Sequence, residues 1–92
     1  MKSISLLGAT GSIGQQTLDI VKEHPESFQI SALSVGRNIE KTKEIIREFQ
    51  PKLVSVLQEE DARALQKEFP KTDFTFGNQG LIDVATYADS TY

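Results

Sequence analysis

The sequence predicts an α/β fold, a doubly wound parallel sheet in which strands alternate with helices, and three observations support this prediction. Short apolar runs alternate with segments whose apolar residues recur at helical spacing. Prolines and glycines separate these segments, and the connections between them are short. Three glycines stand between the first apolar run and the first helical segment. Alternation of this kind is typical of parallel strands joined by right-handed crossovers.

The first part of the chain supplies two strands and the helix between them. Residues 3–7 form a short apolar strand that ends at the first glycine. A helix follows and ends before Pro25, which cannot continue it, and residues 28–35 form the second strand. Residues at the i, i+4, i+7 and i+8 positions predict the face of this helix that packs on the sheet. They are Ile13, Thr17, Ile20 and Val21.

The second part repeats the alternation. A second helix begins at Ile39, places Ile46 and Phe49 on the same face, and ends at Pro51. The elements that follow are a strand over 52–57, a helix over 59–69, a strand over 74–76 and a helix over 79–87. The chain ends where a further strand is due, and parallel sheets usually contain more than four strands. We therefore expect the 92 residues to form the truncated first part of a larger domain.

Composition and charge exclude several classes of protein. A net charge of −3 and a pI near 5.0 argue against a surface for nucleic acid or anionic membrane. The chain contains no cysteine, which excludes disulfides and thiolate metal sites. No apolar run approaches the length of a membrane span, and the N-terminal run is too short for a signal peptide. These observations predict a cytoplasmic protein with neither a nucleic-acid nor a membrane partner.

The three glycines, Gly8, Gly11 and Gly14, indicate a phosphate-binding turn of the Rossmann type. A strand that runs directly into a helix presents free N–H groups and the positive end of the helix dipole at the sheet edge. The first glycine permits the turn, the second admits a pyrophosphate, and the third lets the helix pack closely. The spacing G-x-x-G-x-x-G is one residue longer than the common fingerprint, and a turn without a ligand is the alternative. No lysine follows Gly14, so the segment is not a Walker A loop.

Residues within this turn are the candidate contacts to the phosphates of a dinucleotide. Thr10 and Ser12 can add hydroxyl donors to those of the backbone. Gly11 lets the main chain come close to the pyrophosphate, and the Ile13 amide is aimed at the phosphates.

The end of the second predicted strand indicates which dinucleotide is bound. NAD-binding domains usually place a carboxylate about 20 residues beyond the glycines, but Ser34, Val35, Gly36, Arg37 and Asn38 stand here instead. A carboxylate would repel a 2′-phosphate, whereas Arg37 would attract it. Ser34 and Asn38 can donate uncharged hydrogen bonds, and Gly36 leaves room for the adenosine side. Asn38 is also a suitable N-cap, and Arg37 alone could be a solvated surface residue. The combination favours NADP(H) over NAD(H).

The chain shows no catalytic or metal-binding residues. His24, the only histidine, stands beside a proline at a helix end, where it serves as an exposed capping cation. The acidic run of Glu59, Glu60 and Asp61 stands at a helix start and favours the dipole there. No nucleophile–base pair is visible.

The segment LLGATGSIGQQTLDIVKEHPESFQISALSVGRN resembles the N-terminus of the 1-deoxy-D-xylulose 5-phosphate reductoisomerase family. The motifs that carry the resemblance are G-[AS]-T-G-S-I-G, T-L-D-[IV]-V, [HN]-P-E-x-F and a strand that ends in G-[RK]-N. The similarity is strong over residues 1–38 and continues loosely to Tyr92 through P-K-L-V-S-V and G-x-x-G-L. Together these motifs are much more specific than the glycines alone.

The resemblance implies an NADPH-dependent oxidoreductase. The family isomerises and reduces deoxyxylulose phosphate to 2-C-methyl-D-erythritol 4-phosphate in the non-mevalonate isoprenoid pathway. The implied NADPH contacts are Thr10, Gly11, Ser12 and Ile13 at the phosphates and Gly36, Arg37 and Asn38 around the 2′-phosphate. For the full-length enzyme the resemblance also implies a sugar phosphate substrate, magnesium or manganese, and a homodimer.

In that enzyme the catalytic and metal-binding residues lie beyond Tyr92. We therefore expect residues 1–92 to be the N-terminal part of an NADP-binding domain, without the catalytic and C-terminal domains. This part alone is expected to bind no metal and to be inactive.

Two alternatives stay open. One is another NADP-dependent Rossmann oxidoreductase, such as a semialdehyde dehydrogenase or a protein like dihydrodipicolinate reductase, which HPESF and VGRN disfavour. The other is a non-catalytic nucleotide-sensing module that is complete at this length, which the unfinished C-terminal pattern disfavours.

Overall fold

In the computed structural model, which describes residues 2–88 and 90–91, five parallel strands and four helices alternate along the chain. The elements are β1 (Lys2–Leu6), α1 (Ser12–Glu23), β2 (Phe28–Ser34), α2 (Ile39–Phe49), β3 (Leu53–Val56), α3 (Glu59–Glu68), β4 (Asp73–Phe76), α4 (Gly77–Ala85) and β5 (Ser90–Thr91). The α/β fold class predicted from the sequence is confirmed.

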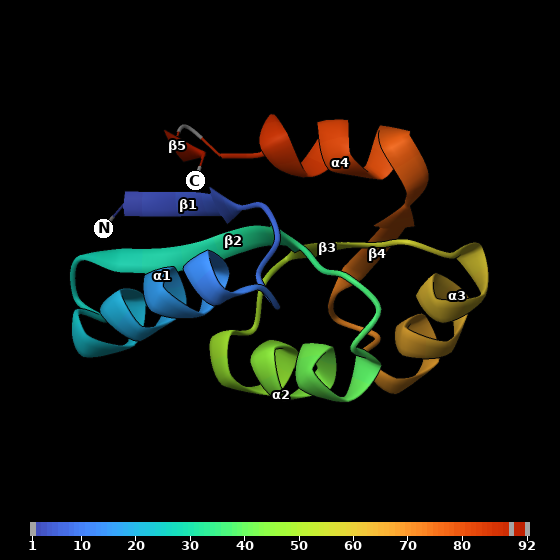
Figure 1. The fold of residues 1–92 in the computed structure, drawn as a ribbon, viewed down its shortest axis with the longest axis horizontal. Helices are drawn as coiled ribbons and strands as arrows, with labels where there is room; N and C mark the ends of the chain where they lie inside the picture. The colour runs from blue at the N-terminus through green and yellow to red at the C-terminus, as the bar shows by residue number, and fades with distance from the viewer. Residues whose placement is uncertain (1, 89, 92) are drawn as a thin grey trace.

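The strands form one sheet in the order β4-β3-β2-β1-β5, and all of its pairings are parallel. From β1 to β4 the chain moves steadily toward one edge, and it then returns to place β5 on the other side of β1. Because crossovers between parallel strands are right-handed, this reversal moves the connecting helix to the opposite face. Figure 1 shows α1, α2 and α3 on one side of the sheet and α4 on the other. The reversal also makes a switch point beside the end of β1, where α/β proteins of this type bind ligands.

The fifth strand corrects the prediction of four. Ser90 and Thr91 pair with Ile4 and Ser5 of β1. A strand of two residues has no apolar alternation that a sequence pattern could reveal. The bounds of the other elements lie within two residues of the predicted ones, which is the usual uncertainty at element ends.

The face of α1 that packs on the sheet is only partly the predicted one: Val21 is buried as predicted, but the two isoleucines are not. Ile13 and Ile20 are 80% and 55% exposed. The residues that α1 buries are Gly14, Leu18 and Val21. Because Gly14 sits directly on the backbone of Gly8 and Ala9, the helix is turned by one residue, roughly 100°, from the orientation that would bury Ile13. A close glycine contact therefore sets the orientation of α1, and the larger apolar side chains do not.

The hydrophobic core lies between the sheet and the inward faces of α1, α2 and α3. The predicted face of α2 is confirmed, since Ile46 is buried and Ile39 and Phe49 pack against the core. On the other face of the sheet, Gly80 brings α4 close enough that a Cβ there would lie 3.2 Å from the Thr75 side chain. The longest described helix, α1, has 12 residues, so no helix in the described ranges could cross a membrane.

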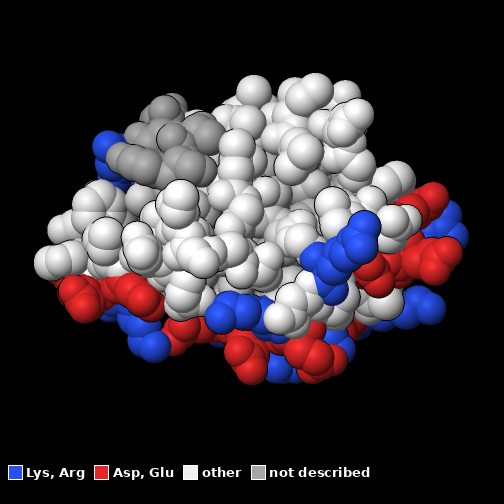
Figure 2. Space-filling view, in the orientation of Figure 1, with Lys and Arg blue, Asp and Glu red and all other residues white. Residues whose placement is uncertain are grey.

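Charged side chains gather on the α1–α3 side of the molecule. Figure 2 shows them along that side, while the surface over α4 is free of charge on the face in view. On the charged side, Lys22 pairs with Glu48 at 2.9 Å, and its hydrogen bond to that carboxylate raises the pKa of Lys22.

The α4 side differs in composition. Between residues 74 and 88, Asp83 is the only charged residue, and α4 exposes Leu81 and Ile82. The α4 side of the molecule therefore carries fewer charges than the α1–α3 side and exposes two large apolar side chains.

Candidate dinucleotide-binding site

The turn between β1 and α1 contains the three glycines, and the structure requires only two of them. Gly8 has a φ of +70°, which residues with a Cβ rarely adopt. A Cβ on Gly14 would lie 2.8 Å from Ala9 Cα and would overlap the Gly8 carbonyl oxygen. Gly11 has a φ of −83°, and a Cβ there would lie 3.4 Å from its nearest neighbour, which is an ordinary contact. Folding therefore explains the glycines at 8 and 14 but not the one at 11.

Gly11 occupies the N-cap of α1, where other residues would stabilise the helix better. Serine, threonine, aspartate and asparagine accept a hydrogen bond from the first turn, worth a few tenths of a kcal/mol relative to glycine, and α1 has no such side-chain bond. The first paired amide of the helix is that of Gln15, which donates to the Gly11 carbonyl at 2.9 Å. Within the described ranges, the N–H groups of Ser12, Ile13 and Gly14 have no acceptor. Unpaired amides at the positive end of a helix dipole are what an anion requires.

The segment between β2 and α2 lies beside this turn. The Gly36 N–H donates to Thr10 Oγ1 at 3.1 Å, and Figure 1 shows the two segments meeting where β1 and β2 end. Arg37 and Asn38 are exposed, and no carboxylate of the described residues pairs with the Arg37 guanidinium. The residues predicted from the sequence thus stand on two adjacent loops. They are Thr10 and Gly11 on the first, with Ser12 and Ile13 directly after it at the start of α1, and Gly36, Arg37 and Asn38 on the second.

Besides Thr10, two further polar side chains near the site have structural partners. Asn38 Oδ1 accepts a hydrogen bond from the Lys41 N–H at 3.1 Å, so Asn38 is the N-cap of α2, as predicted. Its amide NH₂ group is left to donate elsewhere. Ser34, which was expected to donate an uncharged hydrogen bond to the cofactor, is instead buried at 4% exposure, and its Oγ accepts the Gly8 N–H at 2.9 Å. Ser34 lies beneath the turn, a role that sequence reasoning missed.

The residues set aside as catalytic candidates lie apart from these loops. His24 is the C-cap of α1, at the opposite end of the helix from the turn. Glu59 begins α3 and pairs with Arg63 at 2.7 Å. Among the described residues, no group of three or more His, Cys, Asp or Glu side chains could hold a metal ion.

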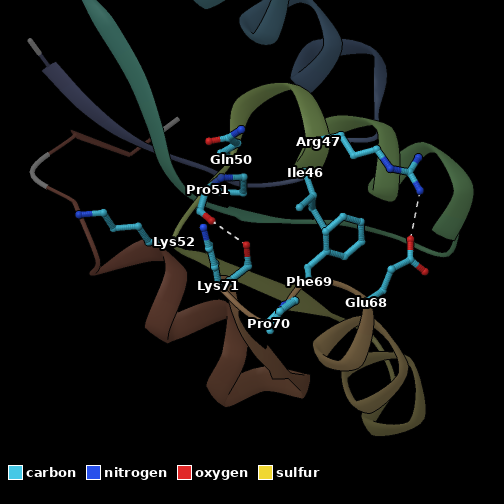
Figure 3. Close-up of a pocket in the computed structure, with 10 residues that line it drawn as sticks. Ile46, Arg47, Gln50, Pro51, Lys52, Glu68, Phe69, Pro70 and Lys71 are labelled. Carbon is cyan, nitrogen blue, oxygen red and sulfur yellow. Dashed lines mark hydrogen bonds and ion pairs between the residues drawn. The ribbon is translucent and has the colours of Figure 1, made fainter.

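A pocket of about 500 Å³ lies away from the glycine turn. It lies where α2 and α3 end, between residues that Figure 3 labels. On its wall, Arg47 pairs with Glu68 at 3.1 Å and lies 5.7 Å from the centre of the Phe69 ring, while Lys52 and Lys71 also line the pocket. Thr72 Oγ1 donates to the Pro51 carbonyl at 3.1 Å and closes the floor. This pocket lies away from the two loops that carry the residues predicted to bind the dinucleotide.

Comparison with known proteins agrees with this geometry. The sequence profile described as 1-deoxy-D-xylulose 5-phosphate reductoisomerase matches residues 4–92. The reductoisomerase of Lysinibacillus sphaericus (strain C3-41) is 62% identical over 99% of this chain and 24% of its own length. That of Listeria monocytogenes serotype 4a (strain HCC23) is 56% identical over 97% of this chain and 23% of its own length. The chain thus spans about a quarter of the length of these relatives.

Solved structures of the same enzyme share the fold. A crystal structure of DOX-P reductoisomerase in complex with NADPH, fosmidomycin and magnesium has a TM-score of 0.90 at 30% identity, covering 99% of this chain and 24% of that one. The enzyme from Zymomonas mobilis in complex with NADPH has a TM-score of 0.86 at 26% identity, covering 98% of this chain and 25% of that one. With a profile match over nearly its whole length, the chain belongs to the 1-deoxy-D-xylulose 5-phosphate reductoisomerase family.

Proposed function

We propose that this chain is the part of a 1-deoxy-D-xylulose 5-phosphate reductoisomerase that binds NADPH. The observation that carries the proposal is Gly11, a glycine that neither backbone conformation nor packing requires, at the helix end where an anion would approach. The unpaired amides of Ser12 and Ile13 would hold the pyrophosphate. Arg37 would hold the 2′-phosphate, with Gly36 and Asn38 around it. The related structures that contain NADPH support this assignment.

The activity of the whole protein is proposed from its family. NADPH would supply the hydride that reduces the isomerised sugar phosphate. One related structure contains fosmidomycin and magnesium, which supports a small phosphorylated substrate and a divalent metal, either magnesium or manganese. The metal ligands and the catalytic residues would lie outside residues 1–92, so this part alone would bind no metal and would be inactive. We further propose a cytoplasmic homodimer.

Residues 1–92 would form the first part of the NADP-binding domain. The uncharged surface over α4, with Leu81 and Ile82 exposed, supports this proposal, because a surface of that kind suits burial against further polypeptide.

The function is tested by following NADPH absorbance in the intact native protein, supplied with deoxyxylulose phosphate and either magnesium or manganese. We expect oxidation of NADPH that depends on both the sugar phosphate and the metal. Binding of NADPH without turnover of this substrate would indicate a different NADP-dependent oxidoreductase. Absence of NADPH binding would instead favour a turn that holds no dinucleotide.

Replacing Gly11 with serine separates ligand approach from folding. Serine is a good N-cap and suits the φ of Gly11, so the free energy of unfolding should stay the same or increase slightly. The added side chain would stand where the pyrophosphate approaches, so the Kd for NADPH should rise by roughly tenfold or more, which corresponds to about 1.4 kcal/mol. Chemical unfolding and isothermal titration of the intact protein measure the two quantities. Unchanged affinity would show that no ligand comes close to this residue.

A further inference from the structure

Ser34 makes two hydrogen bonds to the start of the glycine turn. Its Oγ accepts the Gly8 N–H at 2.9 Å, and its carbonyl oxygen accepts the Ala9 N–H at 2.8 Å. The pairing of β1 with β2 ends at Leu6 and Leu33, so Ser34 holds the chain just after the regular ladder stops. The Ser34 side chain is buried, and water therefore competes little for the hydroxyl.

Gly8 is the residue on which the rest of the turn depends. Its φ of +70° turns the chain out of β1, and its carbonyl oxygen accepts the Gly11 N–H at 3.0 Å. The same carbonyl is the atom on which Gly14, and with it α1, packs most closely. Glycine has more accessible backbone conformations than any other residue. A fixed hydrogen-bond partner for the Gly8 N–H therefore helps to select the left-handed conformation. The Ser34 hydroxyl supplies that partner.

We propose that Ser34 is a positioning residue for dinucleotide binding, an inference that rests on the function proposed above. Its hydroxyl holds Gly8 in the left-handed conformation and so keeps the amides of Ser12 and Ile13 arranged for a pyrophosphate. A loop that is ordered before the ligand arrives avoids an entropic penalty on binding. Because NADPH and NADH carry the same pyrophosphate, loss of the hydroxyl should weaken both by the same factor. Ser34 thus acts on affinity and not on the choice between the two dinucleotides.

The experiment compares Ser34→Ala and Ser34→Thr with Ser5→Ala in the intact protein. Ser5 is a matched control, because it is fully buried in β1 and its Oγ also accepts a backbone N–H, that of Ala88, at 3.1 Å. Ser34→Ala should raise the Kd for NADPH and for NADH equally, by roughly three- to tenfold, the range expected for one neutral hydrogen bond. Ser34→Thr retains the hydroxyl and should restore most of the affinity. Ser5→Ala should lower the Tm by about as much as Ser34→Ala does, because each variant loses one buried hydrogen bond. Its Kd for NADPH should nevertheless stay within about twofold of the wild-type value.

Equal dissociation constants of Ser34→Ala and the wild type for NADPH would overturn the inference. It would also be overturned if Ser5→Ala weakened NADPH binding as much as Ser34→Ala does, or if Ser34→Thr failed to restore the affinity. If the wild type itself binds no NADPH, the proposed function fails first and the inference fails with it. Hydrogen exchange of the Gly8 amide in the wild type gives a readout that does not depend on any variant. Slow exchange supports the inference, and exchange at the rate of an exposed loop contradicts it.

Discussion

Replacing Gly14 with alanine is expected to destabilise the protein and to remove dinucleotide binding together. The new Cβ would lie 2.8 Å from Ala9 Cα and 2.9 Å from the Ala9 carbonyl carbon, besides overlapping the Gly8 oxygen. All three are backbone atoms, so no side chain can rotate to relieve the contact. Either α1 must move away from β1 or the turn must change its conformation.

Overpacking of this kind lowers the free energy of unfolding by about 1–3 kcal/mol. The preference of helices for alanine over glycine returns only roughly 0.5–1 kcal/mol. The net loss is measured by chemical unfolding and the loss of affinity by titration with NADPH, both on the intact protein. Gly11→Ser is the comparison, since it should weaken binding while the unfolding midpoint stays unchanged. An unchanged midpoint for Gly14→Ala would show that α1 is not seated on the turn as described.

The alternation of strands and helices could be predicted because it depends on local signals. A strand is indicated by its own apolar run, and a helix by the spacing of its own apolar residues. Prolines such as Pro25 and Pro51 mark the helix ends directly in the sequence. The two loops of the site could be predicted for the same reason, since glycines after one strand and Gly36-Arg37-Asn38 after the next mark the carboxyl ends of adjacent parallel strands. The sequence therefore predicted that these two loops lie side by side.

What could not be predicted depends on contacts between distant residues. The orientation of α1 follows from the approach of Gly14 to the backbone of Gly8 and Ala9, whereas the sequence pattern ranks Ile13 as the more apolar candidate for burial. The function of Ser34 depends on a partner 26 positions away. One signal was present, because a serine at the end of a buried apolar strand needs a hydrogen-bond partner, but nothing in the sequence identifies that partner as the Gly8 N–H.

Replacing Arg37 with alanine is expected to change the choice of dinucleotide and to leave the fold intact. Arg37 is exposed and has no ion pair with any described carboxylate, so its guanidinium is free for a ligand and contributes no such bond to the fold. A charge-assisted bond to a phosphate contributes about 1.5–3 kcal/mol, so the Kd for NADPH should rise by roughly 10- to 100-fold. The Kd for NADH should change little, because NADH has no 2′-phosphate. Titration of the intact variant with both dinucleotides measures the difference.

Lys41→Ala is the matched control for Arg37→Ala. It removes one positive charge from the first turn of α2 but leaves the Lys41 backbone N–H bonded to Asn38. If a direct contact reads the 2′-phosphate, the control should weaken NADPH by no more than about twofold, since a solvated charge at a distance is screened by salt. Arg37→Lys should recover part of the affinity, because an ammonium still attracts phosphate but cannot form the paired bonds of a guanidinium. Equal losses for NADPH and NADH, or an equal effect of Lys41→Ala, would mean that Arg37 contributes only to the general potential at this edge of the sheet and that another group selects the cofactor.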